Sequence, residues 1–181
     1  SHSQARLEVV GASGRSFDAV LEHIRSDEGF FAQRSSNLYL PPTMAELLYF
    51  DEAVLAPLVA FQQTWQPGKA TDELDVVAVA AHRFDYALVA HEWDDSLLIV
   101  LREDLSGAEP RRYWGTYAFR GGEAEPLIVE IPRPVGEFGT MEMGVRLADE
   151  LSARALFLPG AHWASNHGGA TDWTADGNTD T

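Results

Sequence analysis

The chain contains no cysteine, few basic residues and no long apolar run, and each of these shortages excludes a class of protein. Without cysteine, the 181 residues can form neither a disulfide framework nor a thiolate nucleophile. No apolar run approaches the roughly 18 residues that a membrane-spanning helix needs. The sequence also lacks a glycine-rich phosphate loop, a nucleophile elbow and an HExxH helix, so the common signatures of three large enzyme classes are missing.

Positive charge is scarce as well. The chain has 13 Lys and Arg residues against 28 Asp and Glu residues, which gives a formal net charge of −15. This balance argues against nucleic acid and against anionic membrane surfaces as partners. With 45% hydrophobic residues, the chain suits one globular domain with its own core, predicted over residues 1–181. The compartment stays open between cytoplasmic and extracytoplasmic.

The first third of the sequence favours helices. Ser16 is a candidate cap for a helix through Arg25 whose apolar residues share one face. Thr43 and Glu46 form a capping box, and a long apolar helix is predicted from Met44 to about Gln63. Pro57 is expected to kink this helix or to split it in two.

Extended segments dominate the middle of the chain. Asp75 to Ala81, Tyr86 to Glu92 and Ser96 to Arg102 are apolar runs separated by short polar turns. They are predicted to form an antiparallel meander, with a fourth strand from Arg112 to Arg120 that contains a glycine.

The last part of the sequence indicates a strand–helix–strand unit. Leu127 to Ile131 is predicted as a buried strand, Thr140 to Leu151 as a helix and Ala155 to Leu158 as a second buried strand. The expected architecture is therefore an α/β fold, with a mixed sheet of an antiparallel meander plus a parallel βαβ unit, flanked by helices. Residues 163–181 are predicted as a loop-like C-terminal segment, either a disordered tail or a loop over a site.

The two strands of this unit point to a site. Glu137 follows the first strand and His162 follows the second. Parallel strands joined by a helix end at the same edge of a sheet, so both side chains are expected in one crevice, within reach of His167. A carboxylate and an imidazole are common first ligands of zinc, although helix-start acids and backbone-bonded histidines are frequent structural features too.

The run Glu137-Phe138-Gly139-Thr140-Met141-Glu142, followed by a strand that ends near His162, resembles the zinc amidohydrolases related to carboxypeptidases. Within that group, the run is similar to the phage-type poly-γ-glutamate hydrolases and the N-formylglutamate amidohydrolases. The resemblance covers Pro126 to His167. It implies a phosphorylase/hydrolase-like fold and zinc-dependent hydrolysis of an amide bond in a peptide or an acyl amino acid.

Carried over by residue, the resemblance matches Glu137 to the acidic zinc ligand, His162 to the later histidine and Glu142 to the acid that opens the helix. Arg133 stands where the family has its first zinc histidine. An arginine stays protonated and cannot ligate zinc.

Two outcomes follow from this arginine. Either His82, His91 or His167 completes the metal site, or the site holds no metal and Arg133 pairs with Glu137 or with a bound carboxylate. The sequence thus predicts a metal-dependent amide hydrolase, with a non-catalytic binding or scaffold relative, or one fragment of a processed precursor, as alternatives. Enzymes of that group continue beyond the equivalent of His162, so the resemblance implies either that the end at Thr181 is truncated and the catalytic half is missing, or that a second polypeptide completes the fold as a partner after processing near Thr181.

The candidate residues fall into three groups. Arg133 and Glu142 are the candidate catalytic residues, Arg120 is the candidate for binding an acidic substrate group, and Glu137, His162 and His167 are the candidate zinc ligands.

Overall fold

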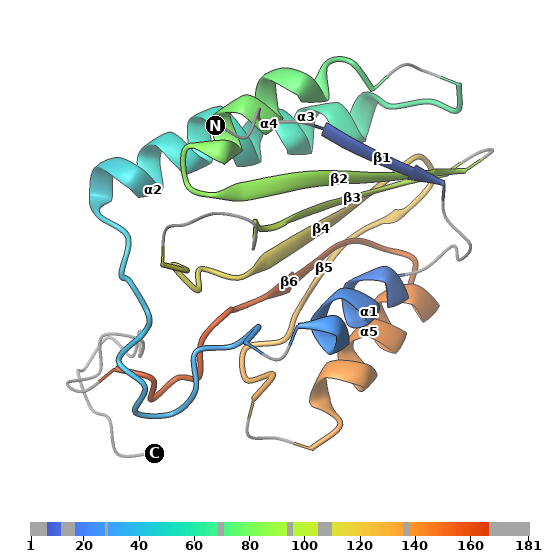
Figure 1. Ribbon diagram of the computed structural model, residues 1–181. Coiled ribbons are helices and arrows are strands. Elements are labelled where there is room, and N and C mark those ends of the chain that lie inside the picture. The colour runs from blue at the N-terminus through green and yellow to red at the C-terminus, as the bar shows by residue number, and fades with distance from the viewer. Residues whose placement is uncertain are drawn as a thin grey trace.

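The protein forms a mixed six-stranded β-sheet with helices on both faces, as a computed structural model shows (Figure 1). The structure describes residues 7–11, 17–27, 29–68, 71–93, 96–104, 110–135 and 138–166. The strand order is β1-β2-β3-β4-β6-β5. The strands are β1 (Leu7–Gly11), β2 (Tyr86–Trp93), β3 (Ser96–Glu103), β4 (Thr116–Gly121), β5 (Glu125–Glu130) and β6 (Ala153–Leu158).

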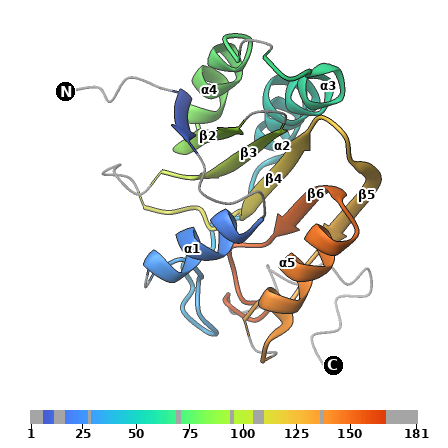
Figure 2. The ribbon, with the colours of Figure 1, turned by 90° about the vertical axis from the view of Figure 1, so that its right-hand side faces the viewer.

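The helices divide between the two faces of the sheet (Figure 2). One face carries α2 (Met44–Phe50), the π-helix η1 (Asp51–Leu55), α3 (Ala56–Thr64) and α4 (Leu74–His82). The other face carries α1 (Asp18–Ser26) and α5 (Thr140–Glu150). Strands β2, β3 and β4 form an antiparallel meander, and β5–α5–β6 is a parallel βαβ unit. The predicted α/β fold with a mixed sheet is therefore confirmed.

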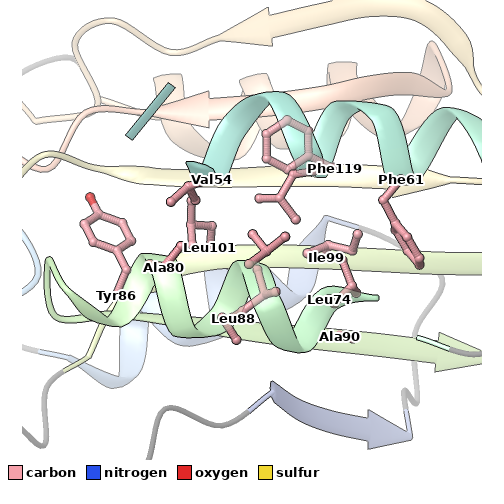
Figure 3. Close-up of a cluster of buried hydrophobic side chains, with 14 of the residues drawn as sticks. Val54, Phe61, Leu74, Ala80, Tyr86, Leu88, Ala90, Ile99, Leu101 and Phe119 are labelled. Atoms are coloured by element: carbon pink, nitrogen blue, oxygen red, sulfur yellow. The ribbon is translucent and has the colours of Figure 1, made fainter. Parts of the chain in front are cut away.

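Two hydrophobic clusters lie on either side of β3. Leu97, Ile99 and Leu101 face the cluster under α3 and α4, which Figure 3 shows, while Leu98 and Val100 face the cluster under α1 and α5. All five side chains are at most 2% exposed. Because β3 is covered on both faces, nearly every residue along it is apolar rather than every second one.

The predicted helix start and break near Pro57 are both confirmed. The Thr43 side chain accepts the amide of Glu46, and the Glu46 carboxylate accepts the amide of Thr43 at 2.8 Å. The long helix passes through the π-helix η1 just before Pro57 and resumes as α3. Proline has no amide N–H, and in a regular α-helix its ring clashes with the carbonyl group one turn earlier. The wider π turn makes room for the ring.

The strand predicted over Asp75 to Ala81 is wrong, because this segment is helix α4. Its alternating valines are typical of a strand, yet Leu74, Val77 and Ala81 are buried at the spacing of a helix face. Val76, on the opposite side, is 75% exposed. The helix covers the faces of β1 and β2, so packing overrides the intrinsic strand preference of valine.

Two further predictions about strands need correction. The strand predicted from Arg112 begins only at Thr116, because Tyr113 and Gly115 have positive φ angles of 60° and 114°. The predicted burial of Leu127 to Ile131 is also wrong: β6 lies between β4 and β5, so β5 is an edge strand and Ile131 alone is buried. Strand β1 was not predicted; it pairs in parallel with β2.

Candidate functional site

The candidate site lies where β5 and β6 both end. In their parallel pairing, Glu130 is opposite Phe157, so the chain leaves both strands at the same edge of the sheet. Beyond this edge the two segments meet: the guanidinium carbon of Arg133 lies 5.8 Å from the centre of the Trp163 ring. We name this region the edge site and define it by Arg34, Arg133, His162 and Trp163. The name refers to the edge formed by the ends of the strands, not to the outermost strand β5.

A loop from the N-terminal part of the chain fixes the segment after β6. The amide of His162 donates to the carbonyl of Ala32 at 2.8 Å, and the amide of Ser35 donates to the carbonyl of Ala164 at 2.8 Å. These backbone bonds hold Arg34 near His162, where its charge lowers the pKa of the imidazole. The edge site is therefore built from three segments that are far apart in the sequence.

His162 is held in one ring orientation. Its Nδ1 accepts the amide N–H of Ala164 at 2.9 Å, and its ring lies 5.3 Å from that of Trp163. Burial, followed by the charge of Arg34, lowers the pKa of His162, so the ring is neutral near pH 7. A neutral imidazole whose Nδ1 accepts a hydrogen bond carries its single ring proton on Nε2.

The described part of the edge site does not fit a zinc ion. A ligating histidine offers a lone pair and usually donates from its other nitrogen, whereas His162 uses its Nδ1 lone pair for an amide and protonates Nε2. Arg34 and Arg133 add positive charge beside it. Among the described residues, no group of three His, Cys, Asp or Glu side chains could hold a metal. Glu137 and His167 lie outside the described residues.

The candidate residues Glu142 and Arg120 form their ion pairs with residues outside the edge site. Glu142, in the first turn of α5, is half-exposed, 3.5 Å from the Arg25 guanidinium. Arg120 is the next-to-last residue of β4, which runs antiparallel to β6, so it lies at the opposite edge from His162. There it binds Asp149 at 2.6 Å, and burial raises the pKa of Asp149. The structure brings together Arg133 and His162, but not Arg120.

Of the two other histidines considered as ligands, His91 lies on β2 opposite Leu98, at the start of β3. It is therefore at the edge of the sheet away from the edge site. His82 is the last residue of α4. Neither belongs to a group of described side chains that could hold a metal.

Comparisons of the chain with protein-family models, with curated proteins and with solved structures give no match. Within the described ranges, no helix has the length and apolar character needed to cross a membrane.

A second group of charged side chains lies at the same edge of the sheet, and the sequence analysis did not predict it. We name it the polar cluster and define it by His23, Asp27, Arg102, Glu103 and Arg111. It joins the end of α1 to the end of β3 and to the segment before β4. All of its members except Arg102 line, with Gly160, a cavity of about 10 Å³, which is room for about one water molecule.

Each charge of the polar cluster faces a partner. Arg111 Nη2 lies 2.7 Å from Asp27 Oδ2, close enough for strong attraction although not aligned as a hydrogen bond, and Arg111 also donates to the carbonyl of Gly29. Arg102 Nη1 lies 2.5 Å from His23 Nδ1. Burial, together with Arg102, lowers the pKa of His23 to about 4, so this imidazole is neutral and accepts from Arg102.

Glu103 anchors the unusual backbone before β4. Its Oε1 accepts the amide of Trp114 at 3.0 Å, and the amide of Tyr113 also bonds to it. Burial nevertheless raises the pKa of Glu103. The neighbouring Gly115 needs its positive φ, and a Cβ there would lie 2.2 Å from the carbonyl oxygen of Leu158. The one signal available in the sequence was Glu103 itself, an acid directly after a strand.

Proposed function

We propose that the edge site binds a small peptide or an acyl amino acid through its carboxylate, and that the chain is a non-catalytic relative of the zinc amidohydrolases. One observation carries the proposal: Arg133, in the position of the expected zinc histidine, places its guanidinium over the Trp163 ring. A cation in that position favours an anionic ligand over a metal cation.

The surroundings of Arg133 suit a carboxylate. Arg34 and Arg133 are both exposed, and neither forms an ion pair with another residue in the described ranges. A guanidinium can donate two parallel hydrogen bonds to a carboxylate. The Trp163 ring offers an apolar surface for the aliphatic part of the ligand. The proton on Nε2 of His162 supplies a further donor.

Calorimetry with N-acetylglutamate tests this proposal. Arg133→Ala should weaken binding at least about tenfold, because the ligand loses a charge-assisted pair of hydrogen bonds. Arg146→Ala is the matched control, since Arg146 is an exposed arginine on α5, 77% exposed beside Glu150. N-acetylglutamine α-amide, which has the same shape but no carboxylate, should not bind. Equal affinities for the native chain and Arg133→Ala would contradict the proposal.

A second candidate is the metal-dependent hydrolase of an amide bond, with zinc as cofactor. The observation that favours it is topological: β5 and β6 end at one edge, and His162 lies in the segment that follows the end of β6 at Leu158. In this case the ligand class is the same, but the bound molecule is a substrate.

Elemental analysis separates the two candidates. The protein is incubated with zinc at neutral pH, dialysed and compared with Glu137→Ala and His162→Ala. One retained zinc ion per chain, lost in both variants and accompanied by cleavage of an acyl amino acid, would favour the hydrolase. Binding of N-acetylglutamate without retained zinc would favour the binding domain.

A further inference from the structure

The edge strand β5 exposes apolar side chains on both of its faces. Leu127 is 44% exposed and Ile128 is 59% exposed. Successive residues of a strand point to opposite faces, so these two side chains lie on the two sides of the sheet. Edge strands are usually short, charged or covered because their free backbone groups attract other strands. Here the charges Glu125 and Glu130 stand only at the two ends.

On one side of β5 lies a groove of about 310 Å³. Ile128 forms one wall and Val59 of α3 contributes to the other. Phe119 and Phe157 line it as an edge-to-face pair, 5.7 Å between ring centres. The Arg154 guanidinium at this groove is already bonded to the carbonyls of Gly122 and Ala124, at 2.9 and 2.6 Å. The groove is therefore apolar, with no unengaged cation to attract an anion.

On the other side of β5, α5 contributes a second apolar surface. Ile131 packs against Gly144 of α5, so Leu127, four residues earlier in the strand, faces the same helix. Leu147 and Leu151 lie one helical turn apart and are 45% and 44% exposed. They lie on the side of α5 opposite to Asp149, which bonds to the amide of Phe17 at the start of α1. Helix α5 packs against both β5 and β6.

Backbone groups of β5 lie between these two apolar surfaces. The amides of Glu125 and Ile131 donate to carbonyls at or beside β6, those of Ser152 and Phe157. The pairing with β6 is regular from Ile128 to Glu130, and the bonding direction alternates there, so Ile128 and Glu130 direct their amide and carbonyl groups away from β6. Pro126, earlier in the strand, has no amide N–H to donate. An added strand is the one kind of ligand that meets the groove, the backbone groups and the α5 surface together.

The charges of β5 indicate which kind of strand could pair beside it. A second copy paired antiparallel about Leu127 and Ile128 would place Glu125 of one chain opposite Glu130 of the other, and like charges in that position destabilise a sheet. Each copy also carries a formal charge of −15. A strand with basic residues at its ends would instead pair with both glutamates.

We propose that β5 is a docking strand for an extended segment of another protein, apolar in its centre and basic at both ends. The segment adds to the sheet beside β5, with alternate side chains in the groove and against Leu147 and Leu151. This docking strand is at the side of the sheet, whereas the edge site lies beyond its ends, so each can be tested without the other.

Fluorescence anisotropy with the labelled peptide Lys-Val-Ile-Thr-Val-Lys tests the proposal. The native chain should bind it saturably, with Ile128→Lys weakening binding at least about tenfold because the variant repels the peptide and fills the groove wall. Val76→Lys, which places the same charge at an exposed valine of α4, should bind as the native chain does. Hydrogen exchange should show new protection at the amides of Ile128 and Glu130. Leu127→Lys serves as the second variant if Ile128→Lys unfolds.

Three outcomes would overturn the proposal. The first is the absence of saturable binding up to about 1 mM peptide, the weakest affinity that a specific strand addition would give. The second is equal binding of the same peptide flanked by glutamate, because the charge argument would then fail. The third is self-association of the native chain in sedimentation that Ile128→Lys abolishes, since a second copy would then occupy β5.

Discussion

The polar cluster and the edge site lie at the same edge of the sheet, but their arginines are used differently. In the polar cluster, Arg111 faces Asp27 and Arg102 faces His23, with the side chains of Arg111 and Asp27 only 22% and 11% exposed. In the edge site, Arg34 and Arg133 are exposed and make no ion pair within the described ranges. Among the described residues, the contact of Arg133 there is with the face of the Trp163 ring.

This difference indicates that the paired arginines stabilise the fold and that the exposed arginines can bind a ligand. A buried charge must be paired because its desolvation otherwise costs several kcal/mol, so the polar cluster contributes to folding. An exposed, unpaired arginine adds little to stability and keeps its donors available to a ligand. We therefore expect substitutions in the polar cluster to affect stability and substitutions in the edge site to affect binding.

The largest effect is expected for Gly115→Ala, beside the polar cluster. Alanine would have to adopt a φ angle of +114°, with its Cβ 2.2 Å from the carbonyl oxygen of Leu158. We expect a loss of about 4 kcal/mol in the free energy of unfolding, measured by urea denaturation. Gly68→Ala is the control: φ is +75° there, but no atom lies within 4 Å of the added Cβ, so the loss should be about 1 kcal/mol. Similar losses would mean that backbone conformation alone matters.

The next largest effect is expected for Glu103→Ala. This substitution removes the acceptor of the Trp114 and Tyr113 amides and leaves both in a largely buried region. Each unsatisfied amide costs about 1–3 kcal/mol, so we expect a total loss of about 3 kcal/mol in urea denaturation. Glu103→Gln keeps an oxygen acceptor and should lose less than about 1 kcal/mol. A large loss in Glu103→Gln would show that the charge, rather than the acceptor, holds this segment.

A smaller, pH-dependent effect is expected from His23. Burial, then Arg102, lowers its pKa in the folded state to about 4 from 6.5, with Arg111 acting in the same direction and Asp27 against it. Below pH 6.5 the unfolded chain binds a proton that the folded chain does not, so stability falls as pH decreases from about 6.5 to 4. Allowing for partial exposure, we expect a loss of about 1–2 kcal/mol. The difference in unfolding free energy between the native chain and His23→Gln, followed against pH, isolates this contribution; a constant difference would contradict it.

Much of the fold could be predicted because its signals are local. The capping box at Thr43, the break near Pro57 and the apolar run of β3 depend on neighbouring residues, and the structure confirms each of them. Helix α4 could not be predicted, since its valines favour a strand and only its packing against the sheet favours a helix. The exposure of β5 depends on the later strand β6, which takes the place beside β4.

Within the edge site and the polar cluster, too, the sequence predicts what depends on local signals and misses what depends on distant segments. Parallel β5 and β6 follow from the strand–helix–strand pattern, which predicts that the residues after both strands lie at one edge of the sheet. Arg34 lies more than 100 residues before His162, and His23 lies about 80 residues before Arg102. No local sequence pattern connects the members of either pair. The Nδ1 bond of His162, which decides whether it fits a metal, depends on one backbone amide two residues later.

The smallest effect on stability is expected for Arg133→Ala, and it tests the comparison most directly. Arg133 is exposed and makes a single contact with Trp163 across 5.8 Å, so its removal should change the free energy of unfolding by no more than about 0.5 kcal/mol. Arg111→Ala should lose about 2 kcal/mol, because it leaves the Asp27 carboxylate mostly buried without its cation. Urea denaturation of both variants measures the difference. If Arg133→Ala lost as much as Arg111→Ala, Arg133 would be part of the framework, and its guanidinium would no longer be available to a carboxylate ligand.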